Sequence, residues 1–129
     1  MADNPIYRGW PWQQRLSIPS GYLTVDSVLY CTFRFGNKAP GVYDYRKFKV
    51  WLTLETGSSL THSITGGGAD DIIQIDIGAS TTKDLSLAER YLVYDLRLEV
   101  SGDDNDIYLG PPIEVEIVST VTDGEGFDV

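Results

Sequence analysis

Residues 91–100, YLVYDLRLEV, contain the pattern that decides the fold class of this chain. One set of alternate positions is wholly apolar, and the positions between them include Asp95, Arg97 and Glu99. An alternation of period two predicts a β-strand with apolar side chains toward the core and polar side chains outward. The predicted core row is Leu92, Tyr94, Leu96, Leu98 and Val100.

The same period recurs over residues 27–120, in segments separated by clusters of Gly, Asp, Asn and Ser. Such spacing is typical of antiparallel strands joined by turns. The other predicted strands are 28–35, 46–55, 59–64, 72–77, 107–109 and 113–119, with a break at Pro111 and Pro112. The predicted core rows are Leu29, Cys31, Phe33 and Phe35; Phe48, Val50, Leu52 and Leu54; Ile73, Ile75 and Ile77; and Ile113, Val115 and Ile117.

About seven short strands in a chain of 129 residues predict one all-β domain. We expect an antiparallel β-sandwich of immunoglobulin-like or jelly-roll type, with a small closed barrel as the alternative. The strands 59–64 and 72–77 should pair around a flexible glycine turn, and only 81–90 could be helical. The expected organisation is an extended N-terminal arm with the first strand over 1–20, a sandwich over 21–122 and a flexible acidic tail over 123–129.

The charge balance bears on possible partners. Lys and Arg total 10 against 19 Asp and Glu, which gives a formal net charge of −9. The average field of such a chain repels phosphates and anionic lipid headgroups, so we expect neither free nucleic acid nor bare membrane as a partner. No apolar run reaches the roughly 18 to 20 residues that span a bilayer, and the start lacks a signal-peptide pattern. We therefore expect synthesis in the cytoplasm.

Catalytic and metal-binding patterns do not emerge from the sequence. With one histidine, His62, and one cysteine, Cys31, the chain cannot build a zinc site from nitrogen and sulfur ligands. Cys31 lies in an apolar row and is interpreted as a buried structural thiol. The acidic clusters 70–71 and 103–106 do not match a calcium loop and are interpreted as turns. We expect no enzyme activity, no cofactor, no metal and no small-molecule substrate.

The N-terminal segment is the strongest candidate for a partner-binding site. It combines Tyr7, Arg8, Trp10 and Trp12 with several prolines, which favour an extended backbone. Tryptophan and arginine are frequent anchors of protein interfaces. The alternative is that both tryptophans pack on the sandwich of their own chain. If the segment is an arm, a chain lacking residues 1–12 should still fold.

A second candidate surface comprises Lys47, Lys49 and Trp51, which period two places on the outward face of the strand 46–55. On a chain of charge −9, such a face is typical of a solvated or lysine-protected strand. If it is functional, we expect it to contact an acidic protein surface. A carbohydrate-binding module that uses Trp51 and neighbouring tyrosines as stacking platforms is the alternative function.

The order of elements resembles the immunoglobulin-like N-terminal domain of baseplate upper proteins, and related small tail-associated proteins, of tailed bacteriophages. The matching pieces are Tyr7-Arg8-Gly9 before a strand, then ITGGGADDIIQIDI, a link with Thr82 and Leu85, YLVYDLRLEV, and a return strand after Gly110 that ends in VEIVSTVT. The resemblance implies a structural virion protein of the baseplate, tail or neck, without catalytic residues. It also implies a homo-oligomer that binds other virion proteins, located in the virion after synthesis in the host cytoplasm. A capsid decoration protein is a further alternative, and a carboxylate-dependent hydrolase is the weakest one.

Overall fold

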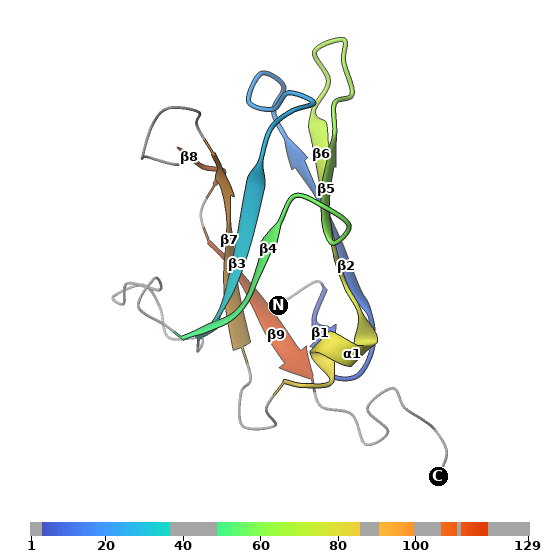
Figure 1. Cartoon of the computed structure of the whole chain (residues 1–129), viewed down its shortest axis with the longest axis vertical. Helices are drawn as coiled ribbons and strands as arrows, with labels where there is room; N and C mark the ends of the chain where they lie inside the picture. Colours follow the sequence, from blue (N-terminus) through green and yellow to red (C-terminus); the bar gives the residue numbers. More distant parts are fainter. Residues whose placement is uncertain (1–3, 37–48, 86–90, 100–106, 111, 119–129) are drawn as a thin grey trace.

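A computed structural model describes residues 4–36, 49–85, 91–99, 107–110 and 112–118 of the chain (Figure 1). These residues lie mostly in strands, which form two β-sheets that face each other in a curled sandwich. Among them, the only helix is the single turn α1 (Ala79–Thr82). The predicted all-β sandwich class is therefore confirmed.

The first sheet has the strand order β1-β9-β7-β3-β4, with β8 paired to β7 as well. Its strands are β1 (Ile6–Tyr7), β3 (Leu29–Gly36), β4 (Val50–Glu55), β7 (Tyr91–Leu98), β8 (Ile107–Tyr108) and β9 (Ile113–Val118). The pair β1 and β9 is parallel, whereas the other pairs are antiparallel. The second sheet is antiparallel in the order β2-β6-β5, with β2 (Trp12–Ile18), β6 (Asp71–Ile77) and β5 (Leu60–Ser63).

The strand β7, predicted from the clearest alternation, lies at the centre of the first sheet. It pairs with β3 along its whole length, and with β8 and β9 in succession on its other side. The core row predicted for it is buried from Leu92 to Leu98, while Val100 lies outside the described residues. Asp95 opposes Thr32 on the other face and is only 4% exposed. The expectation that this face is solvated is thus wrong at Asp95, since neighbouring strands flank a central strand on both sides.

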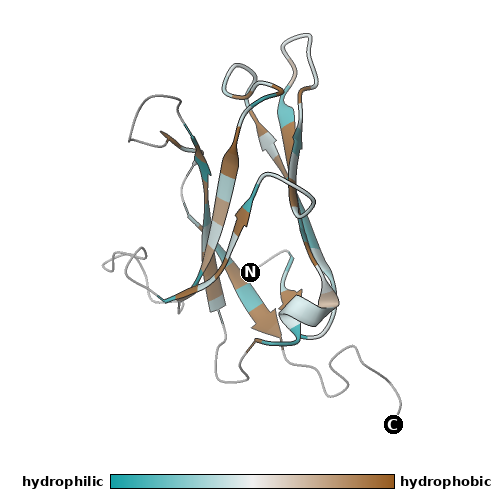
Figure 2. Ribbon diagram, in the orientation of Figure 1, coloured by the Kyte–Doolittle hydropathy of each residue, from teal (hydrophilic) through white to brown (hydrophobic). Residues whose placement is uncertain are grey.

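Much of the core between the sheets is formed by the apolar rows predicted for β3, β6, β7 and β9, whereas Phe48, predicted in the row of β4, lies outside the described residues. Figure 2 shows apolar and polar residues alternating along β3 and β9. Leu29, Cys31 and Phe33 of β3 are fully buried, as are Ile73 and Ile75 of β6. In the C-terminal row only Ile113 departs from the prediction, because it is exposed while Val115 and Ile117 are buried. Cys31 is a buried free thiol, as predicted.

The N-terminal segment is extended, but it is built into both sheets. Residues 6–7 pair with β9 of the first sheet, and Trp12–Ile18 pairs with β6 of the second. Ile6 is fully buried and Trp12 is 4% exposed, so both belong to the core. The expectation that a chain lacking residues 1–12 would fold is therefore not supported.

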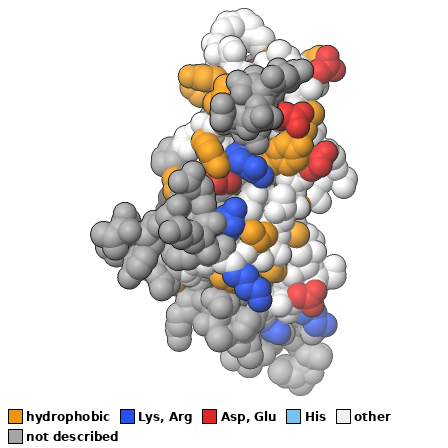
Figure 3. Space-filling model, turned by 60° about the vertical axis from the view of Figure 1, so that its left-hand side comes forward, with side chains coloured by type: hydrophobic (Ala, Val, Ile, Leu, Met, Phe, Trp, Pro, Cys, Tyr) orange, Lys and Arg blue, Asp and Glu red, His pale blue; other side chains and the backbone are white. Residues whose placement is uncertain are grey.

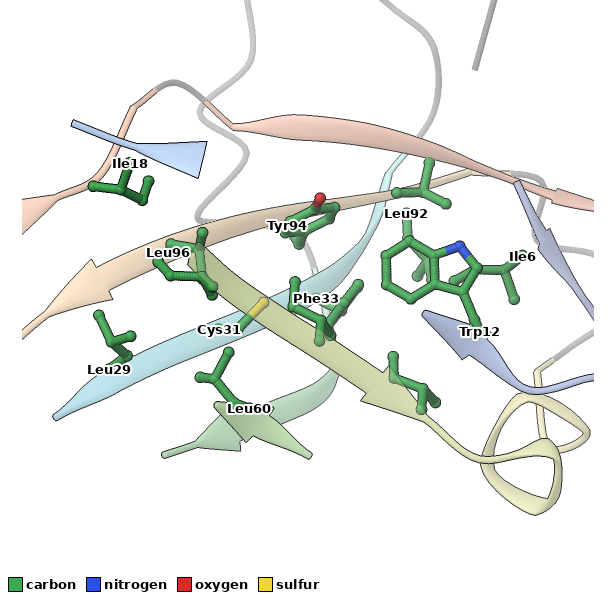
Figure 4. Close-up of a cluster of buried hydrophobic side chains, with 14 of the residues drawn as sticks. Ile6, Trp12, Ile18, Leu29, Cys31, Phe33, Leu60, Leu92, Tyr94 and Leu96 are labelled. Carbon is green, nitrogen blue, oxygen red and sulfur yellow. The ribbon is translucent and has the colours of Figure 1, made fainter. Parts of the chain in front are cut away.

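Trp12 lies between the two sheets (Figure 4). Its ring centroid is 5.9 Å from that of Phe33 and 6.1 Å from that of Tyr94, in edge-to-face geometry. Its Nε1–H donates a hydrogen bond to the carbonyl oxygen of Asn4 at 2.9 Å. A buried indole with its polar atom satisfied contributes its full apolar area to stability. The side chain of Asn4 in turn donates to the carbonyl oxygen of Gln13 at 2.7 Å, at the side of β2 away from β6.

A β-bulge changes the orientation of residues in β4. Phe33 of β3 opposes Leu52, whereas the next residue, Arg34, opposes Val50, so Trp51 is the extra residue. Because a bulge adds one residue, side chains that precede it in the strand point to the opposite face from the one that simple alternation predicts. Val50 was predicted to face the core and is 43% exposed, and Trp51 was predicted to face outward but packs against the core. Both predictions are corrected for this reason.

Of two predicted connections, the glycine turn agrees with the sequence and the helix differs in position. The turn between β5 and β6 has positive φ at Gly66, Gly67 and Gly68, as expected of a glycine turn. The buried Asp71 carboxylate accepts a hydrogen bond from the Thr65 N–H at 3.0 Å, which closes this turn. The helix α1 begins before the predicted segment 81–90, of which residues 86–90 lie outside the described residues.

The position of Trp12 generates a stability prediction. Trp12→Ala removes an indole that contacts both sheets, and it should lower the free energy of unfolding by about 3–5 kcal/mol. Trp10→Ala is the matched control and should change it by less than about 1 kcal/mol, since that side chain is partly exposed. Urea unfolding of the full chain measures both values, and equal losses would contradict this account of the core.

The buried thiol of Cys31 and the buried phenol of Tyr94 predict how the stability of the fold changes at alkaline pH. Desolvation by burial is the largest cause that raises the pKa of the Cys31 thiol and of the Tyr94 phenol. A folded-state pKa above the unfolded one means that the folded chain holds its proton more tightly. The stability from these groups is therefore complete below their ordinary pKa values, 9.0 and 10.0, and is lost as pH rises.

We expect the free energy of unfolding to fall above about pH 9, by roughly 1.4 kcal/mol per pH unit for each group that ionises on unfolding. Tyr94→Phe removes one of the two groups and should make the decline shallower above about pH 10. Urea unfolding between about pH 7 and about pH 11 tests this. A decline of the same slope in Tyr94→Phe would exclude Tyr94 as a source.

Candidate protein interface

The turn between β1 and β2 carries the chain from the first sheet to the second. Gly9 has a φ of 88°, in the left-handed region that favours glycine. The N–H of Trp10 donates to the carbonyl oxygen of Tyr7 at 2.9 Å, which closes the turn. The N–H of Arg8 donates to the carbonyl oxygen of Val118 at 2.9 Å, which continues the pairing of β1 with β9. The turn is thus fixed by its own backbone.

Thr82, at the end of α1, fastens this turn to the rest of the molecule. Its buried hydroxyl oxygen accepts a hydrogen bond from the N–H of Gly9 at 3.1 Å. The same oxygen is 2.8 Å from the carbonyl oxygen of Trp10 and 3.1 Å from that of Ala79, so its one proton can be donated to either. The Nε–H of Arg8 donates to the carbonyl oxygen of Leu85 at 2.9 Å. These bonds hold the turn against α1 and the residues that follow it.

The residues predicted to bind a partner in this segment have different environments. The side chains of Tyr7 and Trp10 are 46% and 40% exposed, and Arg8 is half-buried with its Nε–H bonded to Leu85. Trp12 is the correction, because it is a core residue and cannot contact a partner. The sequence left two alternatives for the tryptophans, a partner interface or packing on their own chain. The exposure of Trp10 fits the first, and the burial of Trp12 fits the second. We call the exposed surface of Tyr7 and Trp10 the Trp10 surface.

The second predicted surface is not assembled as expected. Lys49 is exposed, and its carbonyl oxygen accepts the N–H of Phe35 at 2.9 Å. Trp51 does not share its face, since the bulge directs the ring to Phe33, with centroids 5.8 Å apart and edge-to-face. Lys47 lies outside the described residues. A flat aromatic platform beside two lysines is therefore not present in the described part of β4.

A pocket that the sequence did not indicate lies at the seam between the ends of β2 and β8. Its volume is 290 Å³, and its lining residues are Ser17, Ile18, Pro19, Tyr22, Tyr108, Leu109 and Gly110. We call it the seam pocket. Tyr22 and Tyr108 are 54% and 43% exposed. Exposed tyrosines next to turn residues are the one signal in the sequence that could have pointed to it, since the two stretches are far apart along the chain.

The outer face of the first sheet carries a cluster of polar side chains that contact one another. The guanidinium carbon of Arg97 is 5.3 Å from the ring centroid of Tyr30, and its Nη2 donates to the hydroxyl of Thr32 at 3.3 Å. The hydroxyl of Tyr30 donates to Glu99 at 3.0 Å. Figure 3 shows cationic side chains on this side of the molecule with acidic ones nearby. These contacts link β3 to β7 and the residue that follows it.

No group of three His, Cys, Asp or Glu side chains in the described ranges is placed to hold a metal ion. The described residues also contain no helix of the length and apolar character required to cross a bilayer. His62 has its Nε2 2.9 Å from the carbonyl oxygen of Thr24.

Comparison with known proteins yields no matching family model, no matching curated protein and no matching solved structure. The proposal of a function therefore depends on the sequence and the structure of this chain.

The role of Thr82 can be tested by an isosteric change. Thr82→Val keeps the shape but leaves the N–H of Gly9 and the carbonyl of Trp10 without this partner, which should cost about 1–3 kcal/mol of stability. Thr81→Val, in the same helix and only partly buried, is the matched control. Urea unfolding gives the difference between the variants. A loss no greater than that of the control would show that the hydroxyl does not fasten the turn.

Proposed function

We propose that this chain is a non-catalytic assembly protein that binds neighbouring proteins through the Trp10 surface. The observation that carries this proposal is a 40% exposed tryptophan on a turn held by backbone and side-chain hydrogen bonds. Tryptophan is enriched among residues that dominate binding energy. A side chain presented by a fixed backbone loses less conformational entropy on binding than one on a free arm.

The proposed neighbours are further copies of the chain and other virion proteins of a tailed phage. The support for this part is the order of elements that resembles small tail-associated proteins, from Tyr7-Arg8-Gly9 to the return strand after Gly110. The net charge of −9 favours protein partners over free nucleic acid. Location in the virion, in the baseplate, tail or neck, belongs to the same proposal, and capsid decoration would use the same assembly chemistry.

The alternative of a carbohydrate-binding module depended on an open platform at Trp51. Sugar rings stack on an exposed aromatic face, whereas Trp51 is partly buried and packs edge-to-face with Phe33. This packing disfavours Trp51 as a stacking platform for a sugar ring. The Trp10 surface thus carries the proposed function.

The test compares self-association of the wild-type chain and Trp10→Ala by sedimentation velocity over a range of concentrations. Loss of an interface tryptophan of this kind costs about 2 kcal/mol or more, so we expect self-association to weaken by about 30-fold or more. Val50→Ala is the matched control, because Val50 is an equally exposed apolar residue on the edge strand β4. Trp10→Ala that associates like the wild type would refute the role of this surface.

A further inference from the structure

We infer that the seam pocket is the acceptor for Trp10 of a second copy, so that copies of this chain join head to tail. This inference rests on the proposed function, because it names the partner and the surface that the Trp10 surface binds. It differs from that function in assigning a second, separate site on the same molecule.

The pocket has the chemistry to receive an indole. None of the described lining residues carries a charge, although the net charge of the chain is −9. An apolar side chain can therefore enter without removing a charge from water, which would be costly. Ile18, Pro19 and Leu109 supply apolar walls, and Tyr22 and Tyr108 supply aromatic ones. A volume of 290 Å³ is at the lower limit of typical ligand pockets, which suits one large side chain.

The two sites lie at opposite ends of the long axis of the molecule (Figure 1). The Trp10 surface is in the turn beside α1, and the seam pocket is beside β8 and the loop that follows β2. One copy can thus use both sites at once, with a different neighbour at each. Contacts between two different surfaces of the same protein are heterologous, and they generate closed rings or open filaments.

The charges of the described loop residues at the two ends favour the same arrangement. At the pocket end, the charged residues of 19–28, 64–70, 99 and 107–110 are Asp26, Asp70 and Glu99, and all three are exposed. At the other end, residues 8–11 and 78–85 contain Arg8 and Lys83 with one acid, Asp84. Such complementarity orients the encounter of two copies and disfavours contact between two pocket ends.

The experiment uses one variant for each side of the contact. Trp10→Ala removes the inserted side chain but leaves the pocket intact. Ser17→Glu places a carboxylate at the pocket, where the indole would have to desolvate it, and leaves Trp10 intact. Gln13→Glu is the matched control, since it adds the same charge to another exposed position of β2 outside the pocket. Circular dichroism verifies that each variant is folded.

Size-exclusion chromatography with light scattering then distinguishes the outcomes. Wild type and Gln13→Glu should form species larger than a dimer, while Trp10→Ala and Ser17→Glu should each be monomeric. An equimolar mixture of these two variants should form a one-to-one dimer and nothing larger, because one intact pocket meets one intact Trp10. A contact between two identical surfaces could not produce this complementation.

Other results overturn the inference. If Ser17→Glu associates like the wild type while Trp10→Ala does not, the Trp10 surface binds elsewhere, and only the proposed function survives. A mixture that remains monomeric, or a monomeric wild type, also refutes head-to-tail joining. Should Ser17→Glu fail to fold, Tyr22→Ala replaces it, with Val25→Ala as its control in the same exposed loop.

Discussion

The contact of the Trp12 indole with both central strands of the first sheet is the interaction on which the rest of the structure depends. Trp12 belongs to the second sheet, yet its ring lies edge-on to Phe33 of β3 and Tyr94 of β7. The short strand β1 is paired in the first sheet, so the chain must cross between the sheets just before Trp12. The turn that presents Trp10 exists because of this crossing.

Strands with long regular rows could be predicted from the sequence, because burial of one face imposes a period of two on β3, β6 and β7. The orientation of Trp51 could not, since the bulge is defined by pairing with a separate strand. The burial of Asp95 also escaped prediction, because the central place of β7 results from the pairing of strands distant in sequence. The two residues of β1 are too few to show any period.

The candidate site could be predicted only in part. Its Trp, Arg and Pro content marked the segment around Trp10, but the sequence offered the same two alternatives, an interface or packing on the same chain, for Trp10 and Trp12. In the structure Trp10 lies in the turn and is 40% exposed, whereas Trp12 lies in β2 and is 4% exposed. For the seam pocket the sequence offered only two tyrosines beside turn residues, because residues from 17–22 and 108–110 meet only when β2 and β8 lie at the same end.

The hydrogen bonds around Asn4 affect whether folded chains can add strands to one another at high concentration. Among the described strands β2 pairs only with β6, so its other side could accept a foreign strand and seed misassembly. The side-chain amide of Asn4 donates a hydrogen bond to the backbone carbonyl oxygen of Gln13. The side-chain amide nitrogen of Gln14 lies 3.3 Å from the backbone carbonyl oxygen of Arg15. Two acceptors along this edge are thus already taken. Addition of a foreign strand at this edge of β2 is therefore disfavoured.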